Sequence, residues 1–186
     1  MKRIIIACLS LLVLTACQQK AQVAQNNMAE ESAVETDTAE STLQEGYEVG
    51  NKYIDFEMAA LQGNTIRLSD YVANNRYTLV DFWASWCGPC RAEMPTVVKA
   101  YTEFHGKGLE IIGVSLDNER SAWAGAVEQL NMAWPQMSDL KGWDCSGAAL
   151  YNVRSIPSNV LIDQQGKIVA KDLRGVGLLD KLAELL

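Results

Sequence analysis

The chain has 186 residues, 48% of them hydrophobic and 21% charged, which is the composition of a globular protein with room for one ordinary domain. Its 16 basic and 23 acidic residues give a net charge of −7. This argues against a nucleic-acid-binding protein, because such proteins need a basic surface that displaces counterions from phosphate. Five cysteines are too few for a disulfide scaffold, and a single histidine excludes a histidine-rich metal site.

The first sixteen residues have the pattern of an export signal. Lys2 and Arg3 precede an almost wholly apolar run over 4–14, which is too short for a membrane-spanning helix of about 20 residues. The run ends in Leu14-Thr15-Ala16-Cys17, which resembles the bacterial lipoprotein box. The resemblance implies cleavage before Cys17 and lipid on that residue. We therefore expect a protein of the bacterial cell envelope, lipid-anchored to a membrane, with its domain in the periplasm. An ordinary secretory signal is the alternative.

Residues 17–48 are expected to form an acidic, disordered tether. The stretch has no sustained apolar period and carries seven acidic residues against one lysine. Such a composition cannot bury enough apolar surface to offset the entropy of the chain. The functional interpretation is a tether that holds the domain away from the membrane, and a spacer of no tuned length is equally consistent. Residues 49–186 then form the domain.

Residues 49–186 have the periodicity of an α/β domain. Strands are expected over 53–58, 65–68, 77–83, 109–116, 159–162 and 167–172. Helices are expected over 88–104, 121–130, 147–151 and 177–186. Ser69 and Ser121 are candidate caps, for a short turn and for the second helix. A strand pair, two βα units and a final ββα unit together predict a mixed central sheet with helices on both faces.

The motif WCGPC over 86–90 falls between a predicted buried strand and the longest predicted helix. A C-x-x-C pair in that position indicates a redox dithiol. Cys87 would lie at the helix N-terminus, where unpaired N–H groups and the macrodipole favour a thiolate. Cys90 follows one turn later and can attack a mixed disulfide at Cys87. Gly88 lets the backbone approach a substrate closely, and Pro89 suits the first helical turn.

The cysteine pair has two other possible interpretations, a zinc half-site and a structural disulfide. A zinc half-site needs a second pair of ligands, but only Cys145 and His105 remain in the domain, without paired spacing. We therefore predict no metal and no cofactor. A structural disulfide across two residues closes a very small loop and stabilises little. Cys145 is expected to be a small, partly buried residue, with a third redox thiol as the alternative.

The stretch Val80-Asp81-Phe82-Trp83-Ala84-Ser85 followed by WCGPC is similar to the thioredoxin active-site signature. With the leading strand pair, the continuation over 91–95 (RAEMP) and the export signal, residues 49–186 resemble the TlpA/ResA-like membrane-tethered thiol-disulfide oxidoreductases of bacteria. The resemblance implies a thioredoxin-like fold with an N-terminal strand-pair extension. It also implies that Cys87 is the attacking nucleophile, that Cys90 is the resolving thiol, and that the two form the redox disulfide.

The resemblance assigns two acids to the site. Asp81 matches the buried carboxylate below the thioredoxin dithiol. Because burial raises the pKa of a carboxyl group, Asp81 can accept a proton from Cys90. Glu93 matches a second acid that TlpA/ResA-like proteins place near the dithiol, and a solvated helix acid is the alternative for this residue.

Pro157 matches the cis-proline that faces the dithiol in the family. The backbone at Ile156 would pair with an extended substrate segment. A trans proline in a turn is the alternative, and Ser158 departs from the commoner threonine after this proline. Trp86 and the two residues between the cysteines, Gly88 and Pro89, are expected to border the substrate groove.

The expected function is reduction of disulfides in oxidised exported proteins, since CGPC favours the reducing direction. The resemblance implies a transmembrane thiol electron donor, and by family analogy apocytochrome c is a candidate substrate, which would place the protein in cytochrome c maturation. A thiol peroxidase is an alternative, but peroxiredoxins carry proline and threonine or serine where this chain has Val80 and Ala84. A non-enzymatic metal carrier or holdase on the same fold is a further alternative, although copper carriers of this fold space their cysteines more widely.

Overall fold

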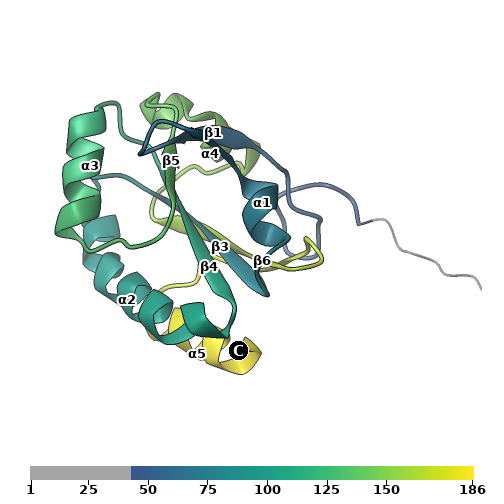
Figure 1. The fold of residues 1–186 in the computed structure, drawn as a ribbon. Helices are drawn as coiled ribbons and strands as arrows, with labels where there is room; N and C mark the ends of the chain where they lie inside the picture. Colours follow the sequence, from purple (N-terminus) through teal and green to yellow (C-terminus); the bar gives the residue numbers. More distant parts are fainter. Residues whose placement is uncertain (1–42) are drawn as a thin grey trace, which may run out of the picture. The chain divides into compact units, whose positions relative to one another are not determined.

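Two parallel strands form the centre of the domain, β3 (Tyr77–Trp83) and β4 (Leu109–Ser115) (Figure 1). The computed structural model describes residues 43–186. Every residue of the two strands except Tyr77 is buried. Both faces of these strands are covered, which explains why their sequences are nearly continuous apolar runs without alternation.

The sheet has seven strands in the order β2-β1-β5-β4-β3-β6-β7. The outer strands are β1 (Glu57–Ala60), β2 (Thr65–Arg67), β5 (Gln136–Ser138), β6 (Ser158–Asp163) and β7 (Ile168–Lys171). Strand β5 is parallel to β4, whereas β1 is antiparallel to β5 and β6 is antiparallel to β3. The sheet is therefore mixed, as predicted.

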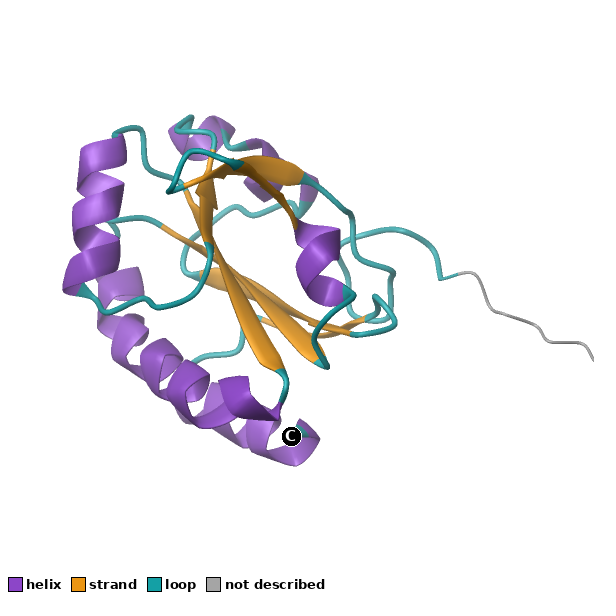
Figure 2. Ribbon diagram, viewed as in Figure 1, coloured by secondary structure: helices purple, strands orange, loops and turns teal. Residues whose placement is uncertain are grey.

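Five α-helices cover the two faces of the sheet: α1 (Leu68–Val72), α2 (Gly88–Phe104), α3 (Arg120–Gln129), α4 (Ser146–Leu150) and α5 (Gly175–Leu185). Short 3₁₀ turns span His105–Lys107 and Gly142–Asp144. Helices α2, α3 and α5 lie on one side of the sheet, and α1 and α4 lie on the other (Figures 1 and 2). The consecutive crossovers β3–α2–β4 and β4–α3–β5 share one hand, which places α2 and α3 on the same face.

The strongest sequence patterns located their elements accurately. Strand β3 and helix α2 begin and end at the predicted residues. Strand β5 was not predicted, because three residues are too few to show a period. The first strand lies at Glu57–Ala60, C-terminal to most of the predicted range 53–58.

The two proposed serine caps are wrong. Arg67 holds the N-cap position of α1, and the Ser69 backbone N–H donates to Asp55 Oδ1 at 2.9 Å. Ser121 lies inside α3, whose N-cap residue is Glu119. Neither N-cap residue makes a side-chain cap hydrogen bond. At the start of α1 the Asp55 carboxylate takes this role, and packing against the sheet stabilises both helices.

The N-terminal part of the described chain is hydrogen-bonded to the β6–β7 hairpin. The Gly50 N–H donates to the Ile168 carbonyl at 2.8 Å, and the Tyr53 N–H donates to the Gly166 carbonyl at 2.9 Å. Residues at the end of the predicted tether make contacts too: the Gly46 N–H donates to the Lys52 carbonyl at 2.9 Å, and Lys171 Nζ lies 3.2 Å from a Glu48 carboxylate oxygen. The export signal over 1–16, the lipid site at Cys17 and the tether up to residue 42 lie outside the described residues. Among residues 43–186, no helix combines the length and the apolar character needed to cross a membrane.

A close approach between β4 and β5 depends on Gly113. A Cβ at this position would lie 2.2 Å from Gln136 Oε1. Gln136 is buried, and its Oε1 accepts a hydrogen bond of 3.1 Å from the indole N–H of Trp83, also buried. The missing side chain at Gly113 thus makes room for the amide that pairs with Trp83.

We expect Gly113→Ala to lower the free energy of unfolding by about 2 kcal/mol, because the new methyl group displaces Gln136 and breaks the buried hydrogen bond. Gly125→Ala is the matched control: Gly125 is exposed in α3 and faces open space, so its replacement should raise stability by about 1 kcal/mol. Urea unfolding measures both. A Gly113→Ala protein as stable as the parent would contradict this account.

Candidate active site

The two cysteines of the WCGPC motif form a disulfide at the start of α2. Cys87 is the N-cap residue of the helix, and its Sγ accepts a hydrogen bond of 3.1 Å from the Cys90 backbone N–H. Both sulfur-bearing residues are buried, whereas Gly88 and Pro89 between them are exposed. An added Cβ at Gly88 would meet nothing within 4 Å, so the backbone here is open to an incoming chain.

The loop before β6 lies against Cys87. The Ile156–Pro157 peptide bond is cis, as predicted, and the Ile156 carbonyl oxygen lies 3.7 Å from Cys87 Sγ. The antiparallel register of β6 and β3 places Ser158 opposite Phe82, close to the end of β3 from which the chain runs on to Cys87. Two segments about 70 positions apart in sequence therefore meet at one sulfur atom.

A buried acid lies on β3 in the strand that leads to the dithiol. Asp81 is 3% exposed, and its pKa is raised from 3.8 to about 7. Burial is the largest cause, the nearby Glu93 carboxylate contributes in the same direction, and the Arg174 guanidinium opposes both effects. Glu93 lies three residues after Cys90 on α2, so the two side chains share one face of the helix. The structure thus brings both predicted acids into one electrostatic cluster.

The turn before α5 joins this cluster to the cis-proline loop. The Gly175 backbone N–H donates to Glu93 Oε1 at 2.7 Å, and the Arg174 guanidinium donates to the Pro157 carbonyl. Sequence reasoning missed Arg174, because nothing in its neighbourhood resembles a motif. A basic residue at the start of the last helix of the fold was the only available signal.

A second carboxylate, at Asp117, holds the segment that leads into the motif. Asp117 is 1% exposed, accepts hydrogen bonds from the Ser85 backbone N–H and hydroxyl at 3.0 and 2.5 Å, and accepts another from the Ser115 hydroxyl at 2.7 Å. These bonds fix the turn two residues before Cys87 to the end of β4. Sequence reasoning missed this support as well.

Two exposed tryptophans stand beside the dithiol. Trp86 and Trp143 are each 53% exposed, and their ring centroids are 6.2 Å apart. Trp86 was expected to border the substrate groove. Trp143 comes from the distant Gly142–Asp144 turn and widens the apolar surface at this end of the domain.

The third cysteine of the domain is separate from the site. Cys145 is free and fully buried, and burial raises the pKa of its thiol. The sequence predicts a small, partly buried residue here, and the side chain is more deeply buried than expected. Within residues 43–186, no three His, Cys, Asp or Glu side chains are grouped as metal ligands would be.

The arrangement is suited to thiol–disulfide exchange. A C-x-x-C pair at a helix N-terminus can provide a nucleophile and a resolving thiol, the Ile156 carbonyl oxygen lies beside the Cys87 sulfur, and a buried carboxyl group can exchange a proton near neutral pH. The fold and the site together define a thioredoxin-like protein.

Comparison with known proteins shows to which family of thioredoxin-like proteins the chain belongs. The AhpC/TSA family matches residues 49–171. The thiol-disulfide oxidoreductase ResA of Bacillus thuringiensis is 31% identical over 145 residues, covering 78% of this chain and 80% of that protein. Two thiol-disulfide oxidoreductase structures are similar, one of a thioredoxin domain from Bacteroides vulgatus and one from Bacteroides fragilis. They are 34% and 33% identical, with TM-scores of 0.68, and cover 74% and 73% of this chain and 96% and 100% of those chains. The chain therefore belongs to the AhpC/TSA family and is a thiol-disulfide oxidoreductase of the ResA type.

Replacing the buried acid should change how stability depends on pH. A carboxyl group whose pKa is raised in the folded state binds its proton more tightly there than in the unfolded chain, so Asp81 costs stability as pH rises from about 4 to 7. We expect Asp81→Asn to remove this cost, raising the free energy of unfolding by about 4 kcal/mol more at pH 8 than at pH 4.

Urea unfolding of the oxidised protein between pH 4 and 8 measures the difference between variant and parent at each pH. Asp180→Asn is the control, because Asp180 is exposed on α5 and its carboxylate stays in water. A difference between Asp81→Asn and the parent that is constant across this range would refute the proposed burial effect.

Proposed function

We propose that this oxidoreductase reduces disulfides of exported proteins in the bacterial cell envelope, held to a membrane by lipid on Cys17 with its domain in the periplasm. The observation that carries the redox proposal is the Cys87–Cys90 pair, set at the N-terminus of α2 against the Ile156 carbonyl. The signal pattern over 1–17 supports export.

The reaction requires two exchanges at sulfur. In the reduced protein, the Cys87 thiolate attacks one sulfur of a substrate disulfide, forms a mixed disulfide and expels the first substrate thiolate, which takes up a proton. The Cys90 thiolate then attacks Cys87 Sγ, which re-forms the Cys87–Cys90 disulfide and expels the second substrate thiolate. Two electrons pass from the dithiol to the substrate, and two substrate thiols are the product.

The acids serve the second exchange. Cys90 must lose its proton before it can attack, and an acceptor is most effective when its pKa is near the ambient pH. Asp81, with a pKa of about 7, has that property. Glu93 acts on this step through its charge, since its carboxylate raises the pKa of Asp81.

Substrate is held at the surface that surrounds the sulfur atom. An extended substrate segment pairs with the backbone at Ile156, which lies beside Pro157, and it crosses the exposed Gly88 and Pro89. The exposed ring of Trp86 lies at the border of this path and offers apolar contact.

The direction of the reaction requires an electron source. A reductase in an oxidising compartment must be re-reduced, which calls for a transmembrane protein that presents a dithiol and transfers two electrons to the Cys87–Cys90 disulfide. Apocytochrome c is a candidate substrate by family analogy alone.

The family match makes thiol peroxidase the second candidate, since the AhpC/TSA family covers most of the domain. The residues argue against it. Val80 and Ala84 occupy the positions where peroxiredoxins carry proline and a hydroxyl residue, and both are fully buried and apolar. No hydroxyl group is supplied from these positions to the reactive sulfur.

The proposed order of attack, with Cys87 before Cys90, can be tested with single cysteine variants. With a disulfide-linked peptide, Cys90→Ser should accumulate a mixed disulfide at Cys87, because the resolving thiol is missing. Cys87→Ser should accumulate about tenfold less mixed disulfide at Cys90, because Cys90 is only 1% exposed. Mass spectrometry after acid quenching counts the adducts, with Cys87→Ser/Cys90→Ser as the control. Equal trapping by the two single variants would show that the roles are misassigned.

The proposed direction of the reaction, reduction of the substrate, can be tested by the reduction potential. In a variant with Cys8, Cys17 and Cys145 changed to serine, only the Cys87–Cys90 pair titrates. Equilibration against defined thiol buffers should give a reduction potential of about −250 mV or lower, as expected of a reductase. A potential of about −120 to −180 mV would instead indicate an oxidase or isomerase and would overturn the proposed direction.

A further inference from the structure

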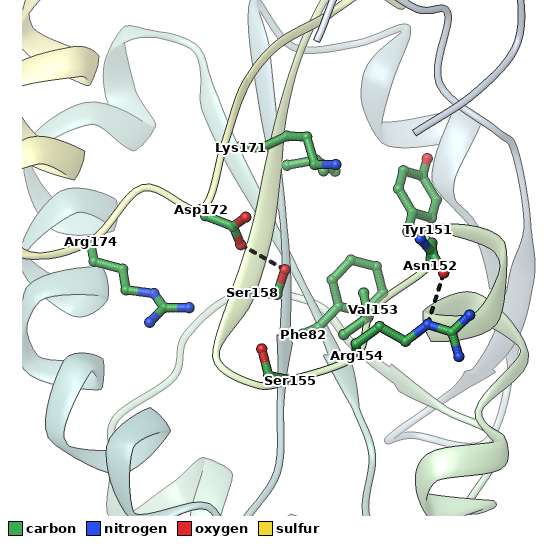
Figure 3. Close-up of a pocket in the computed structure, with 11 residues that line it drawn as sticks. Phe82, Tyr151, Asn152, Val153, Arg154, Ser155, Ser158, Lys171, Asp172 and Arg174 are labelled. Atoms are coloured by element: carbon green, nitrogen blue, oxygen red, sulfur yellow. Dashed lines mark hydrogen bonds between the residues drawn. The ribbon is translucent and has the colours of Figure 1, made fainter. Parts of the chain in front are cut away.

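A cavity of about 500 Å³ opens beside the loop that carries Pro157 (Figure 3). Its walls come from the end of β3, from residues 151–160 and from residues 171–174. The last of these segments includes the turn that leads into α5. The cavity therefore lies between the cis-proline loop and the β7–α5 connection, and Arg174 is the residue of its wall that also belongs to the acid cluster of the redox site.

The cavity is within reach of a substrate bound at the dithiol. Ser155, in its wall, immediately precedes Ile156, whose carbonyl oxygen lies 3.7 Å from Cys87 Sγ. An extended chain advances about 3.3 Å per residue. A substrate strand laid along this loop thus brings a side chain to the cavity within two or three residues of its own reacting cysteine.

Three cationic side chains line the cavity, from Arg154, Lys171 and Arg174, against one carboxylate, from Asp172. Figure 3 shows the two arginine side chains on either side of the central serine, Ser158. Within residues 43–186, neither arginine forms an ion pair with a carboxylate. The cavity is thus locally basic in a chain whose net charge is −7.

Each of the two guanidinium groups has N–H donors that make no hydrogen bond within residues 43–186. Arg154 Nε donates to Asn152 Oδ1 at 2.9 Å, and Arg174 donates to the Pro157 carbonyl. A guanidinium group has five N–H donors, so each arginine keeps several for a ligand. Arg174 also acts on Asp81 through its charge, which leaves Arg154 as the cation with no charged partner among the described residues.

The other charges in the wall are already engaged. Lys171 Nζ lies 3.2 Å from a Glu48 carboxylate oxygen, and Asp172 Oδ1 accepts a hydrogen bond of 2.8 Å from the Ser158 hydroxyl. Arg154 is therefore the one cation in the wall without an acidic partner among residues 43–186, and an incoming carboxylate would supply one.

We propose that this cavity binds an acidic side chain of the substrate, an Asp or Glu within two or three residues of the disulfide-bonded cysteine. Carboxylate geometry suits the guanidinium group of Arg154, which can donate two parallel hydrogen bonds. The inference rests on the proposed function and adds a substrate class to it: disulfide-containing segments with acidic neighbours.

The test uses three disulfide-linked peptides that are identical except at the positions flanking the cysteine, which hold Glu, Gln or Lys. The reduced full chain is mixed with each peptide at low ionic strength, and the second-order rate is divided by the rate of the same peptide with dithiothreitol. This division removes the effect of charge on the peptide disulfide itself. We expect this normalised rate to be about fivefold higher for the Glu peptide than for the Gln peptide. At 1 M salt, where the screening length is about 3 Å, the ratio of the two normalised rates should approach one.

Arg154→Gln should bring the Glu-to-Gln ratio close to one. Lys99→Gln removes the same charge from an exposed residue of α2, twelve positions beyond Cys87, and should keep the ratio. A ratio of one in the parent, an unchanged ratio in Arg154→Gln, or an equal loss in Lys99→Gln would each overturn the cavity assignment while leaving the oxidoreductase function in place. If no peptide is reduced, the proposed function fails and the cavity assignment fails with it.

Discussion

The site depends on the antiparallel pairing of β6 with β3. Because Ser158 lies opposite Phe82, the chain enters β6 at the end of the sheet where it leaves β3 for the cysteine motif. The cis-proline loop and the N-terminus of α2 are therefore neighbours by register. A slip of one residue would turn the buried side chains of β6 to the opposite face, so the core that fixes this register also fixes the distance between Cys87 and Ile156.

The same pairing of β6 with β3 buries the carboxyl group of Asp81, which lies on the central strand with both faces covered. This burial lowers the free energy of unfolding near neutral pH. In the proposed reaction, the same raised pKa of about 7 lets this carboxyl group exchange a proton with Cys90. The Arg174–Gly175 turn moderates the loss of stability. It joins the Asp81–Glu93 pair to the cis-proline loop, so the acid cluster and the proposed substrate-binding backbone are mechanically linked.

The surface around the dithiol has two different characters. On one side the exposed rings of Trp86 and Trp143 offer apolar contact, and on the other the cavity between Arg154 and Arg174 offers donors to a carboxylate. The combination favours substrates whose disulfide has an acidic neighbour, recognised at low cost because the hydrogen-bond donors already stand in position before binding.

The elements with strong periodicity and the residues with local chemistry could be predicted from the amino-acid pattern. Strand β3, helix α2 and the Cys87–Cys90 pair follow from a buried apolar run that meets a C-x-x-C motif. The family resemblance located Asp81, Glu93 and Pro157. Four features could not be predicted, because they depend on contacts between segments distant in sequence. They are strand β5, the room for Gln136 beside Gly113, the role of Arg174 and the cavity at Arg154. No local pattern encodes such contacts, since they arise from strand order and packing.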